Sequence, residues 1–483
     1  MVAPGARSRV GDVVVLGGSL AGLLAAAAVA PYADHVRVLD RDELASELVA
    51  PRRGTPQAGH SHALLMGGMA AFDELVPGFS REVVEGGGIL SDVLGRTLWL
   101  VDDRQLARED SGAVWLIASR TLIEACVRRR VSALSNVTLE GGVDIVDLAS
   151  SADGSRVTGA VVSQRDGTST QRFVAADLVI DASGKKPRSL AWLKANGYAP
   201  PSETVVPAGI RYATRRFAQT AGVLDDLDCV TIPPYPGSRR AGLALRQEGG
   251  VWSVTLGGRF GEEPPTDLDS FRAFARSLPT TEVAEVVEGC TPIGEPLRAA
   301  FPVSRWRHWD RMDRRPRGLV VIGDAVVAVN PTVGQGMTMT AQQAVALRTV
   351  VRERGVDDIE SRAATELAQA VTAAWEIGTI DDVMAVAPDT ASRVDRVVDS
   401  YLGRAIAVGT QRVDVALALL RVFHLVDTYA AMLHPRVVTA VAGPGSHRHV
   451  RASALERRQR HAGTSVGAGG IRSPLQPTTA RKP

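Results

Sequence analysis

Near its N-terminus the sequence reads Asp12-Val13-Val14-Val15-Leu16, then Gly17-Gly18-Ser19-Leu20-Ala21-Gly22, an apolar run over residues 23–30, and Val36-Arg37-Val38-Leu39-Asp40. This order predicts a buried parallel strand, a tight glycine turn, a helix and a second strand. Glycine at 17 permits the turn, a small residue at 19 lets the backbone approach a pyrophosphate, and glycine at 22 lets the helix pack against the strand. Because the first N–H groups of a helix attract anions, the segment predicts a site for a nucleotide pyrophosphate.

Asp40 ends the second strand 23 positions after Gly17. At this distance a carboxylate meets the ribose hydroxyls of an adenosine. A secretory signal is the competing interpretation, because Arg7 and Arg9 precede the apolar run and Ala28-Val29-Ala30 resembles a cleavage site. The glycines inside the run and the strand that follows argue against a signal. Asp12 and Asp34 bound the run too closely for a membrane span.

The composition is that of a globular protein, since 45% of the 483 residues are hydrophobic and 22% are charged. The net charge of +2 is unevenly placed: from Gly443 onward eight Lys and Arg face one acid, Glu456, so the remaining chain carries −5. An acidic body argues against nucleic-acid binding, and residues 443–483 are predicted to form a basic disordered tail. The unpatterned Cys126, Cys229 and Cys290 predict neither disulfides nor a zinc site and favour a cytoplasmic protein.

Several local patterns in the first half predict structure. Residues 52–62 (RRGTPQAGHSH) lead into a helix predicted over 63–75, and we interpret His60 and His62 as hydrogen-bonding to backbone or cofactor rather than to a metal. Strands are predicted at 97–101 and 112–118 on either side of a charged hairpin, and Ser119 is predicted to cap a helix that starts at Arg120. Further strands are predicted at 137–146 and 156–165, and one strand from residue 172 to 181 ends in Asp181-Ala182-Ser183-Gly184.

The second half predicts an inserted sheet and then a return to the first fold. Strand patterns at 206–217, 241–246 and 251–256, with a Gly249-Gly250 turn, predict a mostly antiparallel sheet followed by helices at 267–278 and 281–288. Tyr212, Phe217 and Trp252 could line a pocket, but a core position is favoured. An apolar strand then ends in Gly323-Asp324, and a glycine-lined turn precedes a helix predicted at 338–352, which implies a second electronegative ligand group. Residues 361–441 are predicted to be largely helical, with Val413, Leu417 and Leu420 on one face.

Three motifs now stand together: GGSLAG with Asp40, DASG at 181–184, and GDA followed by NPTVGQGM between 323 and 337. In this order they resemble the FAD-dependent monooxygenases of the para-hydroxybenzoate hydroxylase and squalene epoxidase type, over residues 12–347. Residues 52–62 and 177–217 are most similar to the bacterial polyether epoxidases of the monensin and lasalocid pathways, which convert polyene polyketides to polyepoxides. The resemblance implies an α/β fold with a Rossmann-like FAD-binding domain (10–85, 119–190 and 312–352), an inserted, mostly antiparallel substrate domain (86–118 and 191–311) and a C-terminal helical region (353–442).

The resemblance also implies which residues bind FAD. Gly17, Gly18, Ser19 and Gly22 would hold the pyrophosphate, Asp40 the adenosine ribose, and Asp324 the ribityl chain. Arg120 would reach the pyrophosphate, and Arg53 would lie near the FAD. Pro331 would lie against one flavin face, and the backbone of Gly334, Gln335, Gly336 and Met337 would point N–H groups at the pyrimidine carbonyl. Such a helix N-terminus stabilises the anionic reduced flavin. Ala21, Arg41 and Gly323 complete the implied set.

The activity implied is NAD(P)H-dependent monooxygenation through a flavin C4a-hydroperoxide, most simply epoxidation of an apolar, alkene-containing, polyketide-like substrate that is free or carrier-bound. No second nucleotide fingerprint is present, so NADPH or NADH would bind transiently. This chemistry needs no side-chain nucleophile, and no catalytic side chain, metal, nucleic acid or integral membrane span is expected. Val326 and Val327 stand where aromatic hydroxylases often carry a histidine, and DASG replaces GADG; both weaken the aromatic-hydroxylase interpretation.

Three alternatives remain open. The first is a flavin-dependent hydroxylase of an aromatic or polyketide substrate, and the second is an FAD-binding reductase or redox-silent cyclase. The third, a halogenase, is disfavoured because that family uses a lysine upstream of the DASG position. The lysines of this chain are Lys185, Lys186, Lys194 and Lys482, and none precedes residue 185.

Overall fold

The computed structural model describes residues 10–45, 49–165, 170–235, 238–354, 358–386 and 393–443. The predicted basic tail beyond Gly443 lies outside these residues, as do Arg7 and Arg9. None of the helices in the described residues is both long and apolar enough to cross a membrane.

A parallel sheet contains the first predicted strand at its centre. In order across the sheet its strands are β18 (Leu319–Val321), β12 (Leu178–Asp181), β1 (Asp12–Leu16), β2 (His35–Leu39) and β8 (Val137–Glu140). All neighbouring pairs run parallel, so their carboxyl ends share one edge of the sheet. Gly17, Asp40, Asp181 and Gly323 therefore lie at the same edge, which is where α/β sheets bind ligands. The predicted strand–turn–helix–strand order is confirmed.

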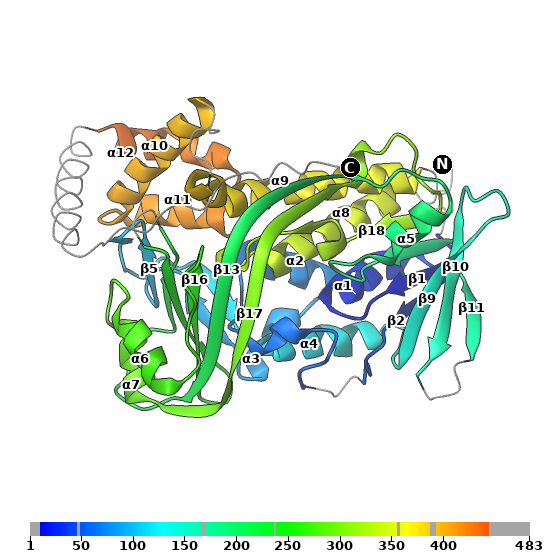
Figure 1. The fold of residues 1–483 in the computed structure, drawn as a ribbon. Coiled ribbons are helices and arrows are strands. Elements are labelled where there is room, and N and C mark those ends of the chain that lie inside the picture. The colour runs from blue at the N-terminus through cyan, green and yellow to red at the C-terminus, as the bar shows by residue number, and fades with distance from the viewer. Residues whose placement is uncertain are drawn as a thin grey trace, which may run out of the picture.

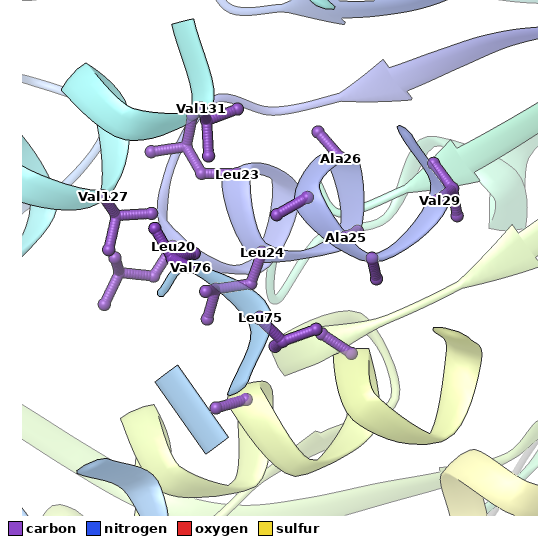
Figure 2. Packing of buried hydrophobic residues seen from close by; sticks show 14 of the residues in the cluster. Leu20, Leu23, Leu24, Ala25, Ala26, Val29, Leu75, Val76, Val127 and Val131 are labelled. Atoms are coloured by element: carbon purple, nitrogen blue, oxygen red, sulfur yellow. The ribbon is translucent and has the colours of Figure 1, made fainter. Parts of the chain in front are cut away.

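The two faces of β1 pack into different clusters. Val13 and Val15 join the core with α1 (Leu20–Val29), α4 (Arg120–Ser132) and α8 (Gly336–Arg354), whereas Val14 and Leu16 face the opposite side. Figure 2 shows Leu20 and Leu23 of α1 directed toward Val127 and Val131 of α4. Since burial of one such leucine contributes about 1.5–3 kcal/mol, packing rather than intrinsic propensity holds α1 in place.

A second, mixed sheet lies beside the parallel one. Its strand order is β19 (Val327–Ala328), β17 (Thr291–His308), β13 (Ser202–Ala218), β16 (Val251–Arg259), β15 (Arg240–Gln247), β14 (Cys229–Ile232), β5 (Thr97–Val101) and β6 (Arg104–Gln105). Its pairs are antiparallel except β5 with β14. Figure 1 shows β13 and β17 as a long curved ribbon that runs from the parallel sheet toward α6 (Leu268–Arg276) and α7 (Glu282–Gly289). β19 belongs to this second sheet because it pairs with β17. It lies within residues 312–352, which the sequence predicts to be part of the FAD-binding domain.

The aromatic residues of the second sheet divide between its faces. Phe217 and Trp252 are fully buried against α6 and α7, as favoured from the sequence. Tyr212 lies elsewhere, with its ring edge-on to His60 at 4.7 Å between centroids. Tyr212 therefore marks the side of the sheet that faces the loop carrying the two histidines.

Smaller elements complete the fold. One short sheet has the strand order β3 (Ala63–Leu64), β7 (Val114–Ile117), β4 (Ile89–Asp92). A second short sheet has the order β11 (Gln171–Ala175), β10 (Val157–Gln164), β9 (Val143–Ser150). The remaining helices are α2 (Met66–Leu75), α3 (Phe79–Glu85), α5 (Arg188–Ala195), α9 (Ile359–Val386), α10 (Arg393–Gly409), α11 (Val413–Phe423) and α12 (Pro435–Ala442). Helices α10 to α12 gather at the end of the molecule opposite β9–β11 (Figure 1). The helical C-terminal region is confirmed, and Val413, Leu417 and Leu420 of α11 share one apolar cluster.

Strands β5 and β7 and a charged hairpin between them are present: β5 pairs with β6 through the turn at Asp102 and Asp103. β5 and β7 themselves belong to different sheets, because β5 also pairs with β14 while β7 pairs with β3 and β4.

Two local predictions were wrong. The strand predicted over 172–181 is two strands, β11 and β12, which belong to different sheets. The strand predicted over 137–146 breaks at Gly142, where φ is +68°. Non-local pairing decides the first case, and adjacent apolar runs carry no information about it.

The helix predicted to start at residue 63 begins at Met66, because Ala63 and Leu64 first pair with β7. The cap at Ser119 is confirmed: its Oγ accepts the N–H of Leu122 at 3.1 Å.

Candidate functional site

The glycine turn after β1 is packed so closely that side chains are excluded from two positions. Gly17 has φ +104°, and a Cβ there would lie 2.7 Å from the carbonyl oxygen of Ala182. A Cβ at Gly22 would lie 1.7 Å from the carbonyl oxygen of Gly17. The turn and the start of α1 therefore require glycine, as the sequence predicted.

Asp40 closes this turn from the neighbouring strand. Its Oδ2 accepts the N–H of Gly18 at 2.6 Å, and its Oδ1 accepts the N–H of Asp42 at 2.8 Å. The carboxylate lies at the carboxyl edge of the sheet beside the glycine turn, and its contact with a ribose stays a prediction.

A group of buried charges lies beside the turn, and we name Arg52, Arg120, Arg128, Asp40 and Glu124 the charge cluster. Glu124 is at its centre: its Oε1 accepts from Arg52 Nε at 3.0 Å and lies 3.6 Å from Arg128 Nη1, and its Oε2 lies 3.5 Å from Arg120 Nη2. Arg52 also approaches Asp40 Oδ1 at 3.4 Å. Three guanidinium groups thus share two buried carboxylates, with Asp42 at the rim 3.6 Å from Arg52.

Arg120 is the member of the charge cluster that retains an unused donor. Its side chain donates to Ser19 Oγ at 3.0 Å, but among the described residues its buried Nε has no hydrogen-bond partner. Burial lowers the pKa of Arg120, while Glu124 and Asp324 act to raise it. A buried, unpaired guanidinium N–H beside the start of α1 fits a phosphate group, which would accept from both.

Asp324 brings the third sequence motif to the same place. The turn at Gly323 has φ +73°, and a Cβ there would lie 2.8 Å from Cβ of Ala21 in α1. Burial raises the pKa of Asp324, and the charges of Lys185, Arg120 and Arg307 oppose that rise. The GGSLAG, DASG and GDA segments therefore share one electrostatic environment, although they are separated by more than a hundred residues in the chain.

The turn after β19 leads into α8, and we name residues 330–336 the α8 loop. Pro331, Gly334 and Gly336 are exposed, and a Cβ at Gly334 or at Gly336 would meet no atom of the described residues within 4 Å. The open N-terminus of α8 thus faces free space. A flat, partly anionic ring fits such a position.

His60 and His62 hydrogen-bond within the protein. His60 Nδ1 lies 2.8 Å from Thr214 Oγ1, and His62 Nδ1 lies 2.9 Å from the carbonyl oxygen of His60. Burial lowers the pKa of each histidine to about 4, so both are neutral at pH 7. Ser61 between them is bonded to Ser253 and Thr255 of β16, which anchors the loop on the second sheet.

His424, which directly follows α11, should make the native state less stable at acid pH. Burial lowers its pKa to about 3, and its Nδ1 accepts the N–H of Met66 at 3.3 Å. The unfolded chain takes up this proton below pH 6.5 and the native chain does not, so stability is greatest above pH 6.5 and falls toward pH 3. We expect His424→Asn, whose Oδ1 can replace Nδ1, to reduce the slope of unfolding free energy against pH by up to about 1.4 kcal/mol per pH unit.

Urea unfolding of the apoprotein between pH 5 and 7 measures this slope. The matched control is His35→Asn, which makes the same substitution at an exposed position. Equal slopes in wild type and His424→Asn would contradict the assignment.

The structure brings most of the implied FAD-binding residues to one edge: Gly17, Gly18, Ser19, Ala21, Gly22, Asp40, Arg120, Gly323 and Asp324. Pro331, Gly334 and Gly336 lie on the α8 loop, while the side chains of Gln335 and Met337 are buried. Arg41 and Arg53 are exposed. The sequence analysis missed Arg52 and Glu124. The i, i+4 spacing of Arg120, Glu124 and Arg128 on one helix could have indicated the cluster, but nothing in the sequence distinguishes Arg52 from Arg53.

Comparison with known proteins adds independent findings. A family model described as FAD binding domain matches residues 40–293. Protein Rv3254 of Mycobacterium tuberculosis is 35% identical over 382 residues, which cover 77% of this chain and 80% of that protein. Kynurenine 3-monooxygenase of Salinispora arenicola is 28% identical over 363 residues, covering 69% and 71%. The solved structure of a flavoprotein/dehydrogenase from Cytophaga hutchinsonii aligns with a TM-score of 0.62 at 16% identity, covering 89% and 96%, and this likeness concerns the fold alone.

Proposed function

The chain belongs to the FAD-binding-domain family, and from this premise we propose that it is an FAD-dependent monooxygenase that uses NAD(P)H and O2 to epoxidise an apolar, alkene-containing small molecule. The observation that carries the proposal is the meeting of three motifs around the unpaired Nε of Arg120 and the free space before α8. Family membership supports FAD binding. The similarity to kynurenine 3-monooxygenase supports oxygenation, and epoxidation and the apolar substrate class are proposed beyond it.

The residues present fit FAD. The pyrophosphate would lie at the start of α1 against Ser19 and Arg120, and the adenosine ribose near Asp40. The ribityl chain would meet Asp324, and the flavin ring would occupy the free space at Gly334 and Gly336. Bound FAD supplies the transfer of electrons from the nicotinamide to O2 and the delivery of oxygen.

The chain itself contributes binding and orientation. The open N-terminus of α8 stabilises negative charge next to it. His60 is neutral and bonded to Thr214, so it neither repels an apolar substrate nor donates a proton readily at pH 7. No nucleophilic side chain is required by this assignment.

An apolar substrate is supported by two features. Val326 and Val327, where aromatic hydroxylases often have a histidine, are buried and apolar. Trp99, Trp115 and Phe423 form an aromatic group that adjoins the α8 loop, because the carbonyl oxygen of Phe423 accepts from Gln335 Nε2 at 2.8 Å. Trp99 and Trp115 are buried, so they make the protein interior next to the α8 loop apolar.

Hydroxylation of an aromatic compound is the second candidate. The similarity to kynurenine 3-monooxygenase favours it. The two candidates give different products, an epoxide or a phenol, so mass spectrometry of the product of each substrate class separates them.

Rapid mixing tests the proposal. We expect the purified protein to take up FAD in a 1:1 ratio, and we expect the anaerobically reduced protein, mixed with O2 and a candidate alkene, to show a transient blue-shifted absorbance before the oxidised spectrum returns. Free FAD reduced in the same way is the control. Direct reoxidation with every alkene and aromatic tried would favour a reductase or a redox-silent cyclase. A protein that takes up no FAD would refute the assignment.

A further inference from the structure

A buried junction joins the α8 loop to two distant parts of the chain. Asp382 of α9 accepts hydrogen bonds on Oδ1 from Arg259 Nη2, at the end of β16, and from Asn330 Nδ2 at 3.1 Å. The exposed fractions of the three residues are 0%, 7% and 1%. We name Asp382, Arg259 and Asn330 the Asp382 junction. It connects the C-terminal helices, the second sheet and the loop that would face the flavin.

Asn330 connects this junction to the turn that follows it in the chain. Its Oδ1 accepts from the N–H of Thr332 at 2.9 Å and from Thr332 Oγ1 at 2.8 Å, and its own N–H donates to Ser304 Oγ at 3.0 Å. The amide is therefore fixed in one orientation, with its NH2 toward Asp382 and its oxygen toward the turn at Pro331–Val333. A change at Asp382 would alter the orientation of Asn330 and with it the shape of this turn.

Helix α9 also contacts the turn directly. Gly378 lies one helical turn before Asp382 and on the same face. A Cβ at Gly378 would lie 3.3 Å from Cβ of Val329 and 3.5 Å from Cγ2 of Val333, which flank the turn. At the other end of the loop, Gln335 Nε2 donates to the carbonyl oxygen of Phe423. The C-terminal helices thus hold both ends of the α8 loop.

We propose that Asp382 is a positioning residue for FAD: it fixes the α8 loop through Asn330, and its pairing with Arg259 means that the junction adds no net charge beside that loop. This inference rests on the proposed function, because it takes the α8 loop to face the flavin. Charges in a buried site interact more strongly than in water, so an unbalanced charge here acts on the reduced, anionic ring.

The two parts of the proposal separate experimentally. Asp382→Asn keeps an acceptor for Asn330 but leaves the charge of Arg259 unbalanced, so it should raise the reduction potential of bound FAD. Arg259→Gln removes one positive charge from the junction and should lower the potential. The double variant Arg259→Gln/Asp382→Asn is neutral again and should return toward the wild-type potential.

Loop positioning has its own readout. Asp382→Ala removes the acceptor of Asn330, and we expect the FAD dissociation constant of the apoprotein to rise about tenfold, the equivalent of one lost hydrogen bond to a charged group. Asp382→Asn should show a smaller rise. A merely structural residue would lower thermal stability in all variants without shifting the potential in opposite directions.

The matched control is Asp228→Asn. Asp228 is also buried and paired, with Arg96 Nε at 2.7 Å, but its partners Ser91, Arg96 and Arg246 lie on other strands and loops. The Asp228→Asn variant should have a lower free energy of unfolding, while the reduction potential and the affinity of bound FAD stay unchanged. If the Asp382 variants do not fold, Arg259→Gln decides the charge question: a lowered potential supports the proposal and an unchanged one overturns it.

Failure of this inference differs from failure of the proposed function. A wild-type protein that binds no FAD would refute both. A wild-type protein that binds FAD, with Asp382 and Arg259 variants that keep its potential and affinity, would refute the role of Asp382 alone.

Discussion

Replacing Gly22 by alanine should abolish FAD binding and destabilise the apoprotein by about 1–3 kcal/mol or more. The new Cβ would lie 1.7 Å from the carbonyl oxygen of Gly17, and backbone rather than a flexible side chain is the obstacle. Relief requires α1 to move away from the turn, which removes the N–H groups that would hold the pyrophosphate. Thermal unfolding of the apoprotein and a fluorescence titration with FAD measure the two effects.

Gly403→Ala is the control for this variant. Gly403 lies inside α10, and a Cβ there would meet no atom within 4 Å in the part of the chain that the structure describes. We expect it to stabilise the protein by about 0.4–1 kcal/mol and to bind FAD as the wild type does. Wild-type FAD affinity in Gly22→Ala would show that the pyrophosphate does not bind at this turn.

Replacing Glu124 by glutamine should give the second large effect. Glu124 faces Arg52, Arg120 and Arg128, and its side chain is 6% exposed. Removing its charge leaves three buried guanidinium groups without their shared partner. Breaking a buried ion pair lowers the free energy of unfolding by about 3–5 kcal/mol. The apoprotein should therefore lose much of its stability.

FAD should restore part of that loss, because its pyrophosphate brings negative charge to the same guanidinium groups. A ligand that binds only the native state stabilises it by an amount that rises with the logarithm of its affinity, so the rise in melting temperature on adding FAD should be larger in Glu124→Gln than in wild type. Thermal unfolding at several FAD concentrations measures the difference. An equal rise in both proteins would place the pyrophosphate away from the charge cluster.

Glu82→Gln provides the comparison, because Glu82 lies on α3 and also pairs with arginines of α4. Glu82 pairs with Arg129 and Arg130 of α4, and its side chain is 18% exposed against 6% for Glu124. Partly exposed pairs contribute little, so the loss of stability should be small. The FAD-dependent rise in melting temperature should match that of the wild type.

The sequence by itself determined the elements whose pattern is local. Val13 to Leu16, the glycines at 17 and 22 and the acid at 40 predict a strand, a turn, a helix and a second strand within one short segment, and each has a physical requirement that few other residues meet. The cap at Ser119 and the Gly249-Gly250 turn are equally local, and the structure contains both. The α/β class followed from the return of such patterns near residues 181 and 323.

The tertiary structure alone decided which distant residues meet. Arg52 rather than Arg53 is buried in the charge cluster, and Asp382 lies beneath a loop that precedes it by fifty residues. The separation of β5 from β7 and of β11 from β12 is of the same kind. The physical reason is that a buried charge is stable only when other elements supply its partners. Which elements meet depends on the packing of the whole chain rather than on neighbouring residues.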